Sequence, residues 1–85
     1  MAEVIRASGE RSSIEPANGR DFTLAEMQQA VGGDVEVIYL HDGRLMLANE
    51  SGHDLGLPWN AQAGELYPHS PIAGDVIVCD RRQVR

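Results

Sequence analysis

The stretch that decides the fold runs from Phe22 to Glu50 and reads FTLAEMQQAVGGDVEVIYLHDGRLMLANE. Near its start, Thr23 and Glu26 have the spacing of a capping box, in which each side chain accepts the backbone N–H of the other residue. Apolar residues then recur at helical spacing, and Gly32 suits the left-handed conformation that ends many helices. The pattern predicts a helix over about residues 23–31.

A β-hairpin is predicted directly after this helix. Residues 35–40 are rich in β-branched and aromatic side chains, which favour a strand, and Asp42-Gly43 suits a two-residue type I′ turn. That turn pairs His41 with Arg44. The resulting register places one apolar set on one face, namely Ile38, Leu40, Leu45 and Leu47. It places a second apolar set on the other face, namely Val35, Val37, Tyr39, Met46 and Ala48.

Both faces of this predicted hairpin are apolar, whereas a hairpin that faces solvent alternates with polar residues. Another element or another subunit must therefore cover the second face. We expect a homodimer, because a chain of 85 residues with few aromatic side chains builds only a small core. The interface residues that this register predicts are Val35, Val37, Tyr39 and Met46.

The remaining elements are less sharply marked. Residues 3–8 and 12–15 predict a weak hairpin, and residues 72–80 contain a continuous apolar run that is typical of a central strand. Asn60 is placed to cap a short helix over about residues 61–66. Together the elements predict an α+β fold, with a small, mostly antiparallel sheet of about four strands, one main helix and one short helix.

Length and composition limit the number of domains and the classes of function. A chain of 85 residues is too short to bury two cores, so we expect a single domain over residues 1–80. Residues 81–85 are rich in arginine and are expected to form a solvated tail. The formal net charge of −6 argues against direct nucleic-acid binding, which needs clustered basic residues.

The single cysteine, Cys79, excludes an internal disulfide, and its place in an apolar run predicts a small buried side chain. No segment has the pattern of a signal peptide, and no apolar run approaches the roughly 20 residues that cross a bilayer. We therefore expect a cytoplasmic protein that makes no membrane contact.

The histidines and the cysteine show no pair at the spacing of zinc ligands, so neither a metal site nor a cofactor is expected. His53 and Asp54 have the residue types of an acid–base pair, in which a carboxylate orients an imidazole. No companion nucleophile is evident, however, and two polar loop residues are the favoured interpretation.

Two polar pairs form the candidate ligand site. Asn49 and Glu50 stand at the end of the second hairpin strand, and Trp59 and Asn60 follow a proline in the next loop. Trp offers a stacking surface and Asn offers hydrogen bonds, which together suit a small ligand. A structural interpretation is favoured over this one, with Asn60 as a helix cap and Asn49 and Glu50 bonded to turn amides.

Four motifs in a fixed order resemble a known family. They are TLAEMQQAVGG-x-VEV, DGRLMLANE-x-G, LGLP-x-N-x-x-A and GDVIVCD, and the resemblance covers about residues 14–80. In these motifs the chain is similar to a family of small domains of unknown function, found mainly in the genes of phages, plasmids and related mobile elements. The resemblance implies a genomic setting and no particular chemistry.

No catalytic constellation is evident, so we expect a non-catalytic binding protein of a phage or mobile element that contacts a host protein or itself. Two alternatives stay open. A protein that sequesters a nucleotide signal would use the two polar pairs and would need Arg6, Arg20, Arg44 or the tail to converge on the phosphates. An acidic mimic of nucleic acid would need carboxylates in phosphate-like rows.

Overall fold

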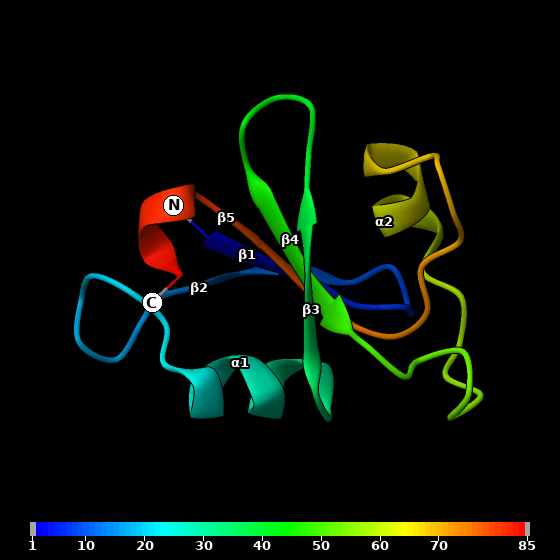
Figure 1. Cartoon of the computed structure of the whole chain (residues 1–85), viewed down its shortest axis with the longest axis horizontal. Coiled ribbons are helices and arrows are strands. Elements are labelled where there is room, and N and C mark those ends of the chain that lie inside the picture. Colours follow the sequence, from blue (N-terminus) through cyan, green and yellow to red (C-terminus); the bar gives the residue numbers. More distant parts are fainter. Residues whose placement is uncertain (1, 85) are drawn as a thin grey trace.

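In the computed structural model, which describes residues 2–84, five strands form one sheet and a helix covers each of its faces (Figure 1). The strands are β1 (Ala2–Ile5), β2 (Arg11–Ile14), β3 (Val35–Tyr39), β4 (Leu45–Asn49) and β5 (Val76–Cys79). The helices are α1 (Leu24–Val31), α2 (Ala61–Leu66) and the short 3₁₀ helix η1 (Arg81–Gln83). The predicted α+β class is confirmed. The sheet has five strands instead of about four, because both strands of the weak N-terminal hairpin join it.

The strands lie in the order β2-β1-β5-β4-β3, and every neighbouring pair is antiparallel. β5 lies at the centre and all of its residues are buried, as its apolar run predicts. β1 ends at Ile5, three residues before the predicted boundary at residue 8. This order makes β2 and β3 the two edges of the sheet.

α1 begins and ends where the sequence predicts. The Glu26 N–H donates to Thr23 Oγ1 (3.2 Å), and the Thr23 N–H donates to the Glu26 carboxylate (2.8 Å). Gly32 takes the left-handed conformation, with a φ of 80°, and its N–H donates to a carbonyl of the last turn. Between these caps the helix buries Met27 and Val31 against the sheet.

The predicted register of the β3–β4 hairpin is wrong by one residue. The prediction paired Tyr39 with Met46, whereas Tyr39 pairs with Leu45 in the structure. The N–H of Leu40 donates to the carbonyl of Arg44 (3.0 Å), so the loop holds three residues where we predicted two.

The side chain of Asp42 explains the longer loop. Its carboxylate accepts the backbone N–H (3.0 Å) and the Nε–H (2.9 Å) of Arg44, a local bonding pattern that Asp favours in turns. Gly43 is left-handed, with a φ of 91°. A type I′ turn would also need Asp42 at a positive φ, and among residues 2–84 only glycines have one.

The shift of one residue changes which side chains of β3 and β4 lie on the same face of the sheet. Met46 lies on the α2 face and is fully buried, whereas Val35, Val37 and Tyr39 lie on the α1 face. The four residues predicted to form an interface therefore do not share a surface. Val37 and Tyr39 are 40% and 65% exposed, so they stay accessible at the β3 edge.

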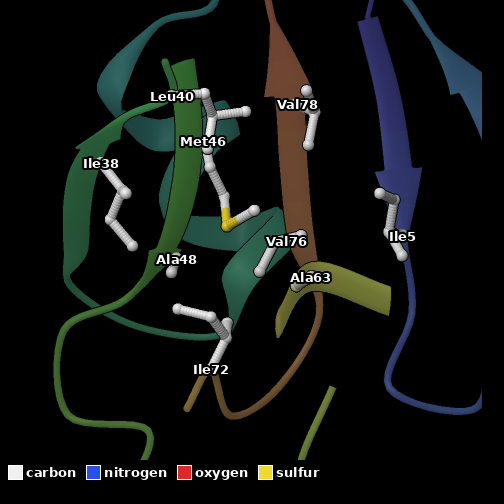
Figure 2. Packing of buried hydrophobic residues seen from close by; sticks show 9 residues of the cluster. All are labelled: Ile5, Ile38, Leu40, Met46, Ala48, Ala63, Ile72, Val76 and Val78. Atoms are coloured by element: carbon white, nitrogen blue, oxygen red, sulfur yellow. The ribbon is translucent and has the colours of Figure 1, made fainter. Parts of the chain in front are cut away.

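Each face of the sheet carries its own hydrophobic cluster. The cluster on the α2 face has Met46 near its centre (Figure 2) and consists of Ile5, Ile38, Leu40, Met46, Ala48, Ala63, Ile72, Val76 and Val78. The cluster on the α1 face consists of Ala2, Val4, Phe22, Met27, Leu45, Leu47, Ile77 and Cys79. Other elements of the same chain therefore cover both apolar faces of the hairpin over most of their area.

We expected a solvated tail over residues 81–85; Arg81 and Arg82 are exposed, whereas Gln83 and Val84 are partly buried, and Arg85 lies outside the described residues. Val84 forms a parallel bridge with Phe22, and the Phe22 N–H donates to the carbonyl of Gln83 (2.6 Å). Val84 also packs against the cluster on the α1 face. The C-terminal segment thus closes this cluster beside the start of α1.

Met46→Ala should destabilise the fold far more than Val37→Ala. Met46 is fully buried, and its truncation leaves a cavity that costs about 2–5 kcal/mol. Val37 is partly exposed, and its truncation costs about 1 kcal/mol or less. Urea unfolding followed by circular dichroism measures both free energies. Equal losses in the two variants would contradict the register of β3 and β4.

Candidate functional site

Asn60 is buried, and its side chain joins three separate segments of the chain. Its Oδ1 accepts the Ala63 N–H (3.0 Å), which caps α2 as predicted. Its Nδ2 donates to the carbonyls of Ile5 and Gly74, both at 2.9 Å. Because both of its donors are used inside the protein, Asn60 holds the scaffold and has no N–H left for a ligand.

Asn49 is also buried and has a comparable structural role. Its Nδ2 donates to the carbonyl of Val31 at the end of α1 (3.1 Å), and its Oδ1 accepts the Ser51 N–H (2.8 Å). Glu50 is exposed, and its backbone N–H donates to the carbonyl of Asp34 (2.8 Å). These bonds fix the end of β4 against α1, and of this predicted pair only Glu50 offers its side chain to solvent.

Trp59 differs from these residues because its side chain is 60% exposed. Its backbone forms an isolated bridge with Ala73, and its ring lies edge-on to His53, with 4.9 Å between the ring centroids. Leu55, on the same loop, is 59% exposed. Residues 51–59 thus carry two exposed large apolar side chains, Leu55 and Trp59, which we together call the Trp59 surface.

A cavity of about 270 Å³ lies between the base of the β3–β4 hairpin and the segment after α2. Its polar lining includes Glu36, Asn49, Glu50, His53 and Tyr67, and none of the arginines within residues 2–84 lines it. His53 Nε2 lies 3.1 Å from the carbonyl oxygen of Pro71, which accepts its hydrogen bond. The structure thus brings Asn49 and Glu50 together in one cavity, while Trp59 lies outside its lining.

A second hollow, of about 470 Å³, lies beside η1. Its lining combines Arg20 and Arg82 with Asp21, Asp80 and Gln83. The two arginines therefore lie together, but the lining of this hollow includes none of the four predicted ligand residues. A nucleotide site at Trp59 would need arginines close to this side chain. Trp59 lines neither hollow, so neither hollow brings arginines to it.

Within residues 2–84, three further arginines form ion pairs with carboxylates at the surface, namely Arg6, Arg11 and Arg44. Arg6 binds Glu10 (3.3 Å) and Asp75 (3.1 Å), and Arg44 binds Asp42 (2.7 Å). Another pair joins Arg11 to Glu3 (2.8 Å). The hydrogen bond from Arg11 lowers the pKa of Glu3, and that from Arg44 lowers the pKa of Asp42. These groups are well exposed, so each pair contributes little to stability.

Cys79 is fully buried in the cluster on the α1 face, as predicted. Burial raises the pKa of its thiol to about 11, with a smaller contribution from the neighbouring Asp80. The thiol is therefore protonated near neutral pH, which removes the nucleophilic thiolate. Over residues 2–84, no three His, Cys, Asp or Glu side chains gather closely enough to hold a metal ion.

Two cavity residues were not assigned to a ligand site from the sequence. His53 was considered as a partner of Asp54, whereas its ring contacts Trp59 and the carbonyl of Pro71. Tyr67 reaches the cavity because it follows α2 and packs against the cluster on the α2 face. No local pattern marks such a residue, because its neighbours come from β3, β4 and the segment at residues 70–72.

The model of one protein family, described as Domain of unknown function (DUF3846), matches residues 3–84. This match confirms a domain of unknown function, and it extends beyond the expected residues 14–80 on both sides. No curated protein and no solved structure matches the chain. Within residues 2–84, neither the length nor the hydropathy of any helix is sufficient to span a membrane.

Asn60→Ala should destabilise the protein by about 2–4 kcal/mol, because it removes a helix cap and two hydrogen bonds to buried carbonyls. Asn18→Ala is the matched control, since Asn18 makes a similar number of hydrogen bonds at an exposed turn. Its expected loss is about 1 kcal/mol or less. Urea unfolding compares the two, and equal losses would contradict a scaffold role for Asn60.

Proposed function

The chain belongs to the DUF3846 family of domains of unknown function, and from this premise we propose that it is a non-catalytic binding protein. It acts in the cytoplasm, as a product of a phage or other mobile element, by contact with a host protein. The mobile-element setting is supported by the four sequence motifs. The observation that carries the binding role is the Trp59 surface, where two large apolar side chains are each about three-fifths exposed.

The Trp59 surface has the properties of a protein contact. Trp is among the residues that contribute most binding energy at interfaces, since it buries a large area when a partner covers it. The loop that carries it is held by backbone hydrogen bonds from Leu55 to Ser51 (2.9 Å) and from Leu57 to Gly52 (3.0 Å). An ordered loop loses little conformational entropy on binding. These features support an anchor that is already in place before the partner arrives.

The segment of sequence that carries this surface is acidic, although Arg6 lines a hollow together with Leu57 and Pro58. Residues 45–80 contain five acidic residues and neither Arg nor Lys. Complementary charge speeds association and disfavours wrong partners. The partner that fits is a host protein with an apolar pocket for Trp59 and a basic rim around it.

Capture from host extract with the immobilised full chain tests this function. The wild-type chain should retain a discrete host protein, and Trp59→Ala should weaken its binding about thirtyfold or more, as for an interface hot spot. Leu24→Ala is the matched control, because Leu24 is as exposed as Leu55, at 59%, but lies on α1. It should retain the protein like the wild type.

Fluorescence of the purified pair gives a second readout. Trp59 is the only tryptophan, so its emission should shift to shorter wavelength when the captured protein covers it. If the wild type retains no discrete protein, or if Trp59→Ala and Leu24→Ala bind equally, the proposal fails.

A small-molecule binder is the second candidate function, and the cavity of about 270 Å³ favours it. The carboxylates of Glu36 and Glu50 line this cavity without an arginine, and Tyr67 adds an aromatic wall. Negative charge and an aromatic ring suit an amine or guanidinium and disfavour a phosphate. The ligand that this alternative supports is therefore a small cation and not a nucleotide.

Thermal-shift measurements with spermidine, agmatine and a panel of nucleotides test the second candidate. Spermidine or agmatine should raise the melting temperature by about 2 °C or more at saturation, and Glu50→Gln should remove the shift. Glu15→Gln removes the same charge outside the cavity and should keep it. If nucleotides alone raised the melting temperature, the expected preference for a cationic ligand would be wrong. If no compound raised the melting temperature, the small-molecule candidate would be excluded.

The acidic mimic of nucleic acid receives less support. Four carboxylates pair with arginines at three places on the surface: Glu10 and Asp75 pair with Arg6, Glu3 with Arg11, and Asp42 with Arg44. A paired carboxylate presents little net charge, and scattered pairs do not form a phosphate-like row.

A further inference from the structure

β3 is an edge of the sheet, and half of its backbone groups point outward. The N–H of Leu40 donates to the carbonyl of Arg44 (3.0 Å), and the N–H of Glu50 donates to the carbonyl of Asp34 (2.8 Å). In an antiparallel ladder these two bonds fix the alternation, so the even-numbered residues of β3 bond to β4 and the odd-numbered residues point away from it. The outward N–H and C=O groups belong to Val35, Val37 and Tyr39.

The two edges of the sheet differ in their protection. β2 carries Arg11 and two serines, and the Arg11 guanidinium binds Glu3 (2.8 Å) and Gln62 (3.1 Å). Charged and polar side chains of this kind discourage the addition of another strand. β3 contains neither proline nor a basic residue, and it exposes Val37 and Tyr39. In Figure 1 no other segment lies in front of β3.

We propose that β3 pairs antiparallel with β3 of a second copy of this chain, with Val37 of both copies at the two-fold axis. In this register Val35 of each copy faces Tyr39 of the other, and all three outward residues form hydrogen-bonded pairs. An axis at Val35 or at Tyr39 would carry the pairing past the end of β3 and lose part of the ladder. Only the register centred on Val37 uses the whole strand.

The side chains make this register self-complementary. Tyr39 opposite Val35 is an aromatic and β-branched pair, which stabilises neighbouring strands. Glu36, the only charged residue of β3, faces Ile38 of the other copy, so no like charges stand opposite each other. The guanidinium of Arg81 lies 5.4 Å from the centroid of the Tyr39 ring and helps to hold this ring at the edge. These pairings make β3 of a second copy a suitable partner for this edge.

This inference is independent of the proposed function, because β3 and the Trp59 surface are separate elements. A dimer through β3 would join two sheets into one and would leave both Trp59 surfaces uncovered by the pairing. Trp59→Ala should therefore remain dimeric even if it loses its host partner. Conversely, a monomeric wild type would not contradict the proposed contact of Trp59 with a host protein.

Sedimentation equilibrium of the full chain tests the dimer over the micromolar range. The wild type should be dimeric. Val37→Lys and Val37→Glu should each weaken self-association about a hundredfold, because each variant places like charges opposite each other at the axis. An equimolar mixture of the two variants should form a heterodimer. Ser12→Lys adds the same charge to β2, the opposite edge, and should stay dimeric.

Circular dichroism and urea unfolding establish that each variant is folded, which is expected because Val37 is already 40% exposed. A monomeric wild type would overturn the proposal, as would Val37 variants that remain dimeric. Two monomeric variants that fail to combine on mixing would overturn the register centred on Val37. Recovery of the dimer in the mixture, with Ser12→Lys unaffected, would establish the pairing of β3 with itself.

Discussion

The complete burial of β5 is the constraint on which the rest of the structure depends. Val76 and Val78 lie in the cluster on the α2 face, and Ile77 and Cys79 lie in the cluster on the α1 face. A strand with no exposed side chain needs a covering layer on both faces and a hydrogen-bonded neighbour on both sides. α1 and α2 supply the layers, and β1 and β4 supply the neighbours. A chain of 85 residues is thereby arranged in three layers.

The covering layers are short, and this explains why apolar residues remain at the surface. α1 has eight residues and is therefore about 12 Å long. A sheet of five strands is about 19 Å across, so one short helix cannot cover all of it. Val37 and Tyr39 lie at the part of the α1 face that stays open. The other exposed surface has a different origin, because Asn60 and the bridge between Trp59 and Ala73 fix the loop that carries Trp59.

Local chemistry made some elements predictable from the sequence, and long-range contacts made others unpredictable. The caps of α1 and α2 depend on side chains within a few residues, so Thr23, Glu26 and Asn60 could be assigned correctly. The hairpin register failed because Asp42 bonds to Arg44 and lengthens a turn whose Asp-Gly pair also suits the shorter type.

Non-local contacts account for the remaining differences. The position of Val84 depends on its bridge to Phe22, which is far away in the sequence, and no local pattern encodes that bridge. The cavity is lined by β3, β4, residue 53 and the segment after α2, so the sequence could place Asn49 and Glu50 at a strand end without revealing their surroundings. The lining and the charge of this cavity follow from the packing of these separate segments, which only the complete fold brings together.

The central place of β5 also has a consequence for biosynthesis. The hairpins β1–β2 and β3–β4 are each local and can form as soon as their residues emerge from the ribosome, yet only β5 joins them. Contacts between distant parts of a chain slow folding, and until β5 is synthesised both hairpins have incomplete apolar cores. Before β5 is synthesised, the nascent chain therefore exposes apolar surface that favours aggregation.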